Sequence, residues 1–125
     1  MLRSAGAVAA GYLVFASSAV LLFQLSGRQP HASATPAFEV VTVIWGIVFA
    51  LIAGWLTARI AVRRPTTHAA VLAALIALGA LISLLTSPGG AIWTQVAALL
   101  LMAPAALAGG AIARAARSRA RANDE

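Results

Sequence analysis

The sequence contains no cysteine and no lysine, and only three of its 125 residues are acidic. Without cysteine, disulfides, thiolate nucleophiles and cysteine-ligated metal sites are excluded. Two of the acidic residues belong to the terminal Asn-Asp-Glu, so Glu39 is the one carboxylate in the body of the chain. Paired carboxylates, an HExxH motif and a Ser-His-Asp set are also missing from the sequence. We therefore expect no enzyme, and no metal or other cofactor.

Charge of either sign is scarce, because 10% of the residues are charged and 62% are hydrophobic. A soluble domain of this size has about a quarter of its residues charged, so this is the composition of an integral membrane protein. The net charge of +6 comes from arginines beside apolar stretches. There they serve topology and contact with anionic lipid, and no base-reading motif accompanies them. The expected partner is the lipid bilayer and not nucleic acid, and the length allows a single domain over 1–125.

A helix needs around 20 apolar residues to cross a hydrocarbon core of about 30 Å. Four stretches of the chain meet this length, at about 5–25, 37–62, 67–86 and 91–114. Their apolar residues do not alternate as in barrel strands, and four segments cannot close a barrel. The sequence predicts an all-α membrane protein with four transmembrane helices, followed by a polar, frayed cytoplasmic tail at 115–125.

Prolines and short turns predict how these helices begin and pack. Pro36 opens the second helix at its first position, with Thr35 as the cap. Arg64 precedes a proline and is pushed out of helical geometry. Pro104 lies inside the fourth helix and bends it. The turns on both sides of the third helix are very short, which forces antiparallel neighbours and predicts an antiparallel bundle.

The arginines predict the orientation of this bundle. Alternate regions sum to eight arginines on one side and Arg28 alone on the other, so both termini are expected in the cytoplasm (N-in/C-in). Arginine without lysine, together with abundant alanine and glycine, suggests a GC-rich bacterial genome, so the expected location is a bacterial cytoplasmic (inner) membrane. Alternatively, the first helix is a signal peptide cleaved at the small residues 32–34. Its apolar run of 21 residues is longer than a usual signal core of about 7–15.

Glu39 is the main candidate for a polar site, in the first turn of the second helix on the outer side. A carboxylate is favourable at a helix N-terminus, which accounts for it without any function. Alternatively, Glu39 is a proton or cation site in an outer vestibule, whose expected neighbours are Gln24, Thr42, Ser83, Thr86, Thr94 and Gln95. Arg59 is expected to extend its guanidinium to the cytoplasmic headgroups. His31 and His68 fall on opposite sides of the membrane and cannot share a metal.

Small residues recur at every fourth position in three of the predicted helices. The second carries Gly46, Ala50, Gly54 and Ala58; the fourth carries Ala105, Gly109 and Ala113; the third carries Gly79, Ser83 and Ser87. Such spacing lets helix backbones approach closely in lipid. Such spacing also arises easily by chance in an alanine-rich chain, so the stripe of the second helix carries the inference. It indicates packing inside the bundle, or alternatively a face that binds a second copy or another membrane protein.

Three short strings carry a resemblance: AVAAGYLVF near the N-terminus, TPAFE before the second helix and AGWLTARIA within it. Together they resemble a group of small bacterial membrane proteins with four predicted helices and no assigned function. The resemblance covers the first two helices. It implies an inner-membrane protein and no activity.

Two functions follow from these patterns as hypotheses. The first is a non-catalytic component of the inner membrane that associates through its small-residue helix faces. The second is a small oligomeric transporter or channel with an outer polar vestibule near Glu39.

Overall fold

Residues 2–29, 34–61, 63–87 and 92–123 are described in the computed structural model, and all regular secondary structure among them is helical. Three long helices come first: α1 (Leu2–Ser26), α2 (Pro36–Ile60) and α3 (Pro65–Thr86). A fourth runs on as three parts: α4 (Ile92–Ala97), the π-helical η1 (Ala98–Met102) and α5 (Ala103–Asn123). All four are long and apolar enough to span a membrane, which confirms the prediction of four such helices for the described part of the chain. His31 and residues 32–33 of the cleavage pattern lie outside the described residues.

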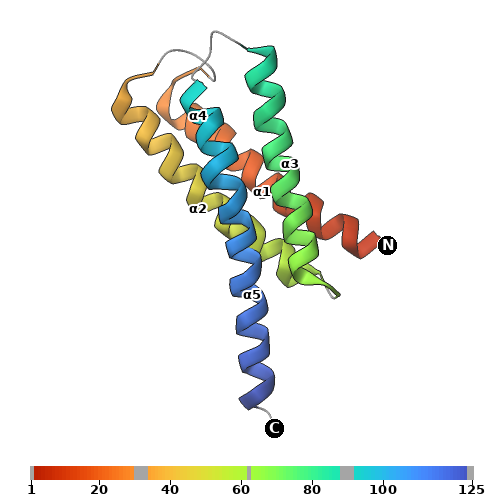
Figure 1. Ribbon diagram of the computed structural model, residues 1–125. Helices are drawn as coiled ribbons and strands as arrows, with labels where there is room; N and C mark the ends of the chain where they lie inside the picture. Colours follow the sequence, from red (N-terminus) through yellow and green to blue (C-terminus); the bar gives the residue numbers. More distant parts are fainter. Residues whose placement is uncertain (1, 30–33, 62, 88–91, 124–125) are drawn as a thin grey trace.

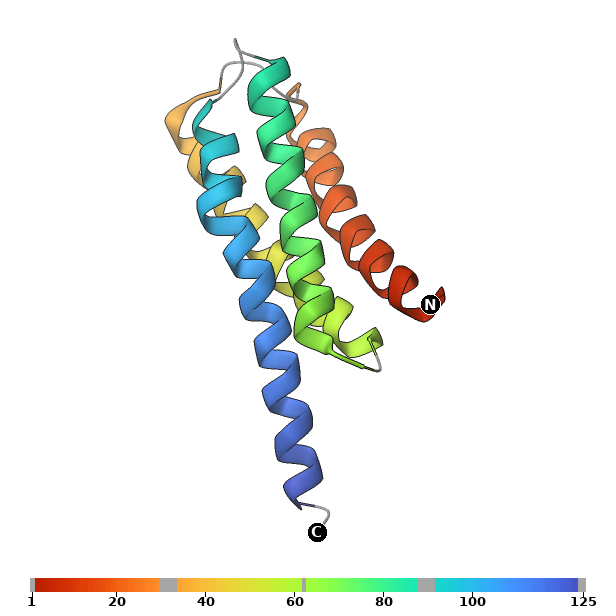
Figure 2. The same ribbon diagram turned by 45° about the vertical axis from the view of Figure 1, so that its right-hand side comes forward.

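The helix ends gather at two ends of the molecule (Figure 1). The end where α1 finishes and α2 begins, with Glu39 in its first turn, is called here the Glu39 end. The opposite end holds Arg59 in the last turn of α2 and Arg64 at the cap of α3, and is called the arginine end. Toward this end α1 diverges from the other helices, and α5 extends past the turn between α2 and α3 (Figure 2).

The local signals before α2 and α3 act as the sequence predicts. The hydroxyl oxygen of Thr35 accepts a hydrogen bond from the backbone N–H of Phe38 at 3.4 Å, and Pro36 occupies the first turn. Arg64 adopts a left-handed conformation with φ 51°, which turns the chain directly before Pro65. Arg64 therefore ends the connection from α2, and Pro65 lies in the first turn of α3.

The fourth helix contains a π-turn that the sequence does not reveal. Pro104 has no N–H for the carbonyl four residues earlier, and its ring crowds that carbonyl. In the turn before Pro104 the helix is π-helical, and the backbone N–H of Ala103 donates a hydrogen bond to the carbonyl oxygen of Ala98, five residues earlier. Such π-bulges, like prolines, are among the features at which helices kink.

The chain beyond residue 114 is helical, whereas the sequence predicts a frayed tail. The helix α5 continues to Asn123, and Arg117 ties it to the end of α2. The Arg117 guanidinium donates to the backbone carbonyls of Ala58 at 3.0 Å, Arg59 at 2.9 Å and Ala61 at 3.2 Å. The last carbonyls of a helix have no partner within the helix, and a cation is favoured beside them. The predicted tail is thus an extension of α5 that caps α2.

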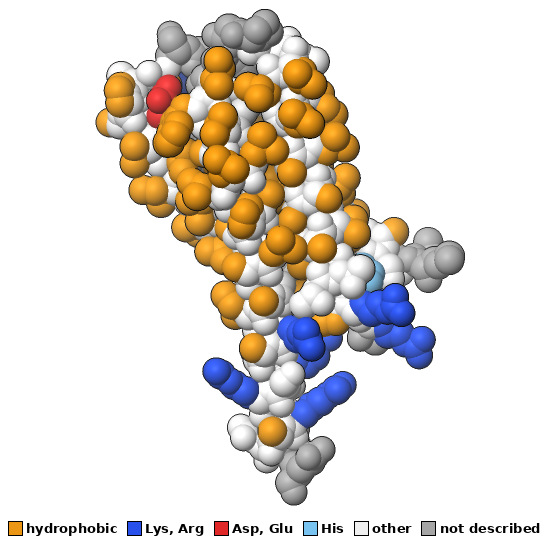
Figure 3. All heavy atoms as spheres, in the orientation of Figure 1, with side chains coloured by type: hydrophobic (Ala, Val, Ile, Leu, Met, Phe, Trp, Pro, Cys, Tyr) orange, Lys and Arg blue, Asp and Glu red, His pale blue; other side chains and the backbone are white. Residues whose placement is uncertain are grey.

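Side chains of different kinds separate along the molecule (Figure 3). Apolar side chains cover its middle, arginines gather at the arginine end, and the acidic side chain lies near the other end. The buried core is built largely from small residues where α2, α3 and α5 meet, together with Leu72, Ile76 and Met102. The exposed middle is therefore largely apolar, which suits a chain surrounded by lipid.

Candidate functional site

The small-residue stripe of α2 packs against other helices of the same chain. Gly46, Ala50, Gly54 and Ala58 are all buried, and the helix packed against them is α5 with η1. A side-chain carbon added at Gly54 would collide with the backbone carbonyl of Ala106. One added at Gly109 would collide with the carbonyl of Leu51. Backbone therefore meets backbone on both sides of this contact, and a second chain has no access to the stripe in this arrangement.

The same packing continues toward the arginine end. Ala113 is buried, and a carbon added at Gly110 would overlap the side chain of Ala69 on α3. On the other side of α2, a carbon added at Gly11 of α1 would overlap the hydroxyl of the fully buried Thr57. Each of the other helices thus has a glycine or small residue where it crosses its neighbour, so this half of the bundle is closely packed.

Gly46 differs from the rest of the stripe, because it faces a flexible side chain. A carbon added there would meet the Sδ and Cε atoms of Met102 and not a backbone atom. Met102 lies in the π-turn, so the contact between α2 and the fourth helix changes here from backbone to side chains. The two helices are held further apart from this point toward the Glu39 end.

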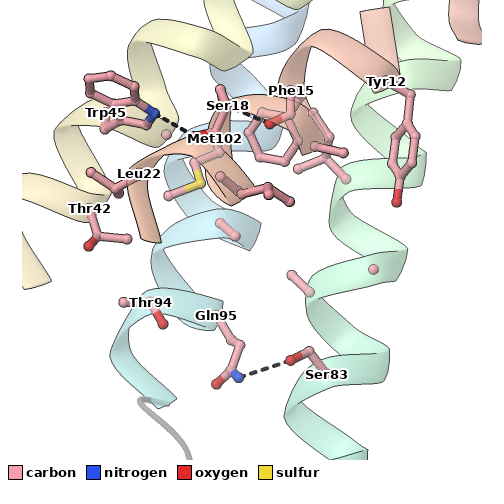
Figure 4. A pocket seen from close by; sticks show the side chains of 18 of the residues that line it. Tyr12, Phe15, Ser18, Leu22, Thr42, Trp45, Ser83, Thr94, Gln95 and Met102 are labelled. Carbon is pink, nitrogen blue, oxygen red and sulfur yellow. Dashed lines mark hydrogen bonds between the residues drawn. The ribbon is translucent and has the colours of Figure 1, made fainter. Parts of the chain in front are cut away.

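A cavity of about 490 Å³ occupies the space that this separation leaves (Figure 4). It is lined by α1, α2, α3, α4 and η1, and most of its wall is apolar, including Phe15, Leu22, Trp45, Ile76 and Met102. Pockets of this size and lining are typical of sites for small organic molecules. The cavity is the candidate functional site of the protein.

Some of the predicted outer polar residues line this cavity and others do not. Gln95 lines it and is buried. Thr42, Ser83 and Thr94 line it as well. Glu39 is half-buried and Gln24 is exposed, and neither belongs to the described lining. The structure therefore brings four of the expected neighbours together around a cavity, but without the carboxylate. Beside Glu39, Phe38 stacks under the Arg28 guanidinium, 4.7 Å from the ring centre.

Most polar groups of the cavity wall are bonded within the protein. The indole N–H of Trp45 donates to the Ser18 carbonyl at 3.0 Å, and the Ser18 hydroxyl donates to the Phe15 carbonyl at 2.7 Å. The Thr42 hydroxyl donates to the Phe38 carbonyl at 2.9 Å. The first of these bonds joins the ring of Trp45 on α2 to the backbone of α1.

Gln95 has a buried atom that remains unpaired. Its Nε2 donates to the Ser83 hydroxyl at 3.0 Å, joining α4 to α3 (Figure 4). Its Oε1 has no hydrogen-bond partner, and Gln95 as a whole is only 5% exposed. This oxygen has less than 1 Å² of accessible surface, so it is closed to the cavity, and the buried hydroxyl of Thr57 likewise has no partner among the described residues.

The cavity is accessible from the side, between α1 and α3. The lining residues that stay exposed on α1 include Tyr12 and Val20, and those on α3 include Leu75 and Gly79. Gly79 leaves a gap in this wall, because a side-chain carbon added there would meet no atom within 4 Å. The fourfold spacing of small residues at Gly79 therefore does not coincide with a helix contact.

Among the described residues, no group of three or more His, Cys, Asp or Glu side chains lies close enough to hold a metal ion. Comparison of the chain with protein-family models, with curated proteins and with solved structures finds no match.

Sequence reasoning identified Gln95 but not the cavity to which it belongs. The signal available was the group of hydroxyl and amide residues within a few turns of one membrane face. Nothing in the sequence indicated that Gly79 opens this group to lipid, because glycine spacing is the same at a contact and at a gap.

Proposed function

We propose that the protein is a non-catalytic component of a bacterial cytoplasmic membrane that holds a small, largely apolar guest molecule. In this proposal the four helices form an antiparallel bundle with both termini in the cytoplasm, so the cavity lies in the outer half. The observation that carries the proposal is the apolar cavity with its opening between α1 and α3.

The orientation is supported by the separation of charge along the bundle. Eight of the nine arginines belong to regions that the positive-inside rule places in the cytoplasm. Arg59 also lies 5.2 Å from the ring centre of Trp55, a pairing suited to a membrane interface. The α5 extension with its arginines then projects into the cytoplasm.

The small-residue faces support the bundle itself in this proposal. Because the stripe of α2 is covered by α5, it holds the cytoplasmic half closed. A second copy or another membrane protein would associate through the lipid-facing surfaces and leave the stripe untouched.

Single cysteines test the orientation, because the natural chain has none. We expect Gln29→Cys, beyond the end of α1, to react in intact cells with a maleimide that does not cross membranes. Ser118→Cys, on the exposed α5 extension, is expected to react only after the membrane is permeabilised. The reverse pattern would overturn the N-in/C-in orientation.

Photolabelling in nanodiscs tests the guest site. The probe is a 12-carbon methyl ether that carries a diazirine, and labelled residues are located by mass spectrometry. We expect saturable labelling of Leu22 and Ile76, which line the cavity but are 8% and 3% exposed and therefore shielded from bulk lipid. Gly79→Leu fills the opening without a backbone clash, so this labelling should fall at least about tenfold.

Gly6→Leu is the matched control for Gly79→Leu. A carbon added at Gly6 also meets no atom within 4 Å, and Gly6 does not belong to the described lining. Labelling of Leu22 and Ile76 should be unchanged in this variant. If the two buried positions are labelled no more than exposed lipid-facing residues, or equally in both variants, the guest site does not exist.

A small oligomeric transporter is the second candidate, favoured by the π-turn at the cavity. Ala98 and Met102 both line the cavity and lie in η1, where a helix is less regularly bonded and can rearrange. Transport would require the packed half beneath the cavity to open. This candidate predicts solute or proton flux in proteoliposomes that Glu39→Gln alters, and absence of flux under imposed gradients counts against it.

A further inference from the structure

We propose that the guest is a phospholipid of the surrounding membrane, with one acyl chain in the cavity and its headgroup phosphate bound to the guanidinium of Arg28 at the Glu39 end. This inference rests on the guest site described above and adds the chemical class of the guest. Two features carry it, the apolar cavity with its opening to lipid and a cation held near the cavity wall.

The end of α1 holds Arg28 beside this wall. Gly27 has a φ of 64°, a left-handed conformation that ends the helix. Its N–H donates to the carbonyl of Gln24 at 3.3 Å, and the N–H of Arg28 donates to the carbonyl of Phe23 at 3.3 Å. This pair of bonds is the Schellman motif, which turns the chain back over the last helical turn. Arg28 is thereby tied to Phe23, which lines the cavity.

Two aromatic rings connect the guanidinium with the cavity. The ring centres of Phe23 and Phe38 are 6.2 Å apart, and the guanidinium carbon of Arg28 lies 4.7 Å from the centre of the Phe38 ring. This carbon is therefore within about 11 Å of the centre of the Phe23 ring. In a phospholipid, a glycerol unit separates the phosphate from the first carbons of the acyl chains. One lipid can thus contact Arg28 and the cavity together.

The charge of Arg28 is available to a phosphate. Among the described residues Arg28 forms no ion pair, and its side chain contacts the ring of Phe38. Glu39 follows Phe38 in α2, and it is not paired with Arg28 either. A guanidinium can bind a phosphate through two parallel N–H donors. Because Arg28 is exposed and Glu39 repels an anion at this end, we expect a modest preference for phosphate.

The opening lies at the depth of acyl chains. Val20 is six residues before the end of α1 at Ser26, and Gly79 is seven residues before the end of α3 at Thr86. At a rise of about 1.5 Å per residue, the opening is about 10 Å below these helix ends, measured along the helices. Headgroups stay at the membrane surface, so the part of a lipid that meets the opening is its hydrocarbon chain.

The cavity wall suits a hydrocarbon chain and excludes the phosphate. Trp45, Ser18 and Thr42 donate their hydrogen bonds to backbone carbonyls, and Oε1 of Gln95 is closed to the cavity. Tyr12, on the exposed rim, is the one ionisable residue among the described lining residues. A phosphate inside the cavity would therefore be buried without a counter-charge, which costs far more than burying a chain. The phosphate stays outside, on the side of Arg28.

Competition against the diazirine ether tests this chemistry with the full chain in nanodiscs of digalactosyldiacylglycerol, a bilayer lipid that has no phosphate. The competitors are phosphatidylglycerol and diacylglycerol with the same acyl chains, and inorganic phosphate in the buffer. We expect phosphatidylglycerol to displace the ether from Leu22 and Ile76 at about fivefold lower mole fraction than diacylglycerol. High salt should reduce this difference, because Arg28 is exposed. Inorganic phosphate should not displace the ether, because it has no chain.

Arg28→Gln is expected to bring phosphatidylglycerol and diacylglycerol to equal strength, while the ether still labels Leu22 and Ile76. Arg3→Gln is the matched control, because it removes the same charge from an exposed position at the other end of α1. The preference for phosphatidylglycerol should be unchanged in this variant. The ratio in the wild type needs no variant, so a misfolded Arg28→Gln would not remove the test.

The outcomes separate the two proposals. Absence of saturable labelling would remove the guest site itself. Saturable labelling with phosphatidylglycerol and diacylglycerol equal in the wild type would leave the guest site and overturn the phospholipid. A preference that survives in Arg28→Gln, or that is lost equally in Arg3→Gln, would overturn the role of Arg28. Displacement by inorganic phosphate alone would show that the phosphate does not come from a lipid.

Discussion

Gly54→Leu is expected to break the bundle, with a loss of more than about 3 kcal/mol in the free energy of unfolding. A side chain at this position would occupy the space of the Ala106 carbonyl, which belongs to the backbone of α5. Two helices would have to separate along their whole contact, because a backbone segment inside a helix cannot move alone. Unfolding of the purified protein in mixed micelles, followed by helical circular dichroism across an SDS titration, measures this change.

Two other glycines provide the controls for this variant. Gly6→Leu makes the same chemical change where nothing lies within 4 Å, and should be neutral or slightly stabilising because leucine favours helix more than glycine. Gly46→Ala should cost less than about 1 kcal/mol, because the flexible end of Met102 can move aside. Equal effects at Gly54 and Gly6 would show that α2 and α5 do not pack backbone to backbone.

Arg117→Ala is expected to destabilise the arginine end, by about 1–2 kcal/mol after allowance for the partly exposed site. Its guanidinium joins three carbonyls at the end of α2, none of which has a helical partner. Without it, the extension of α5 beyond Arg114 loses these three hydrogen bonds to the end of α2. Amide hydrogen exchange should therefore accelerate over 115–123 and at the start of α3, with little change near Trp45.

The control for Arg117→Ala is Arg121→Ala, which removes the same charge from an exposed position of α5. Hydrogen exchange at the α2–α3 turn should not change in this variant. Arg117→Lys should have an intermediate effect, because an ammonium keeps the charge but lacks the fork of donors that reaches several carbonyls. If Arg121→Ala and Arg117→Ala act equally, general charge and not the cap holds α5 in place.

The helices themselves were predictable because their signals are local. Apolar runs set the four spans, and the cap at Thr35 with Pro36 placed the start of α2 to within a residue. Pro104 likewise indicated a break in the fourth helix, since a missing N–H disturbs the turn before it wherever that helix packs. Such features depend on a few neighbouring residues and are visible in the sequence.

The length of α5 was not predictable for the opposite reason. The bonds from Arg117 span 56 to 59 positions along the chain, so nothing near Arg117 reveals them. Considered alone, the arginine-rich end has few apolar residues to order it. Its helical structure depends on carbonyls at the end of α2, which become available only once the bundle has formed.

Glycine spacing could not separate packing from an opening. Gly54 and Gly79 occur in similar fourfold patterns, yet one touches backbone and the other borders an open space. The difference arises because α5 crosses α2 near Gly54, whereas a carbon added at Gly79 meets no atom within 4 Å. The cavity is thus a property of how helices cross, while Gln95 shows only that a polar side chain lies near one membrane face.

Native mass spectrometry of the protein released from its own membrane tests the guest site most directly. Wild type and Gly6→Leu should each retain one lipid-sized molecule at collision energies that strip bulk lipid, and Gly79→Leu should appear as the bare chain. A bare wild-type chain under these conditions, or equal retention in Gly79→Leu, would contradict the proposal that the cavity holds a guest.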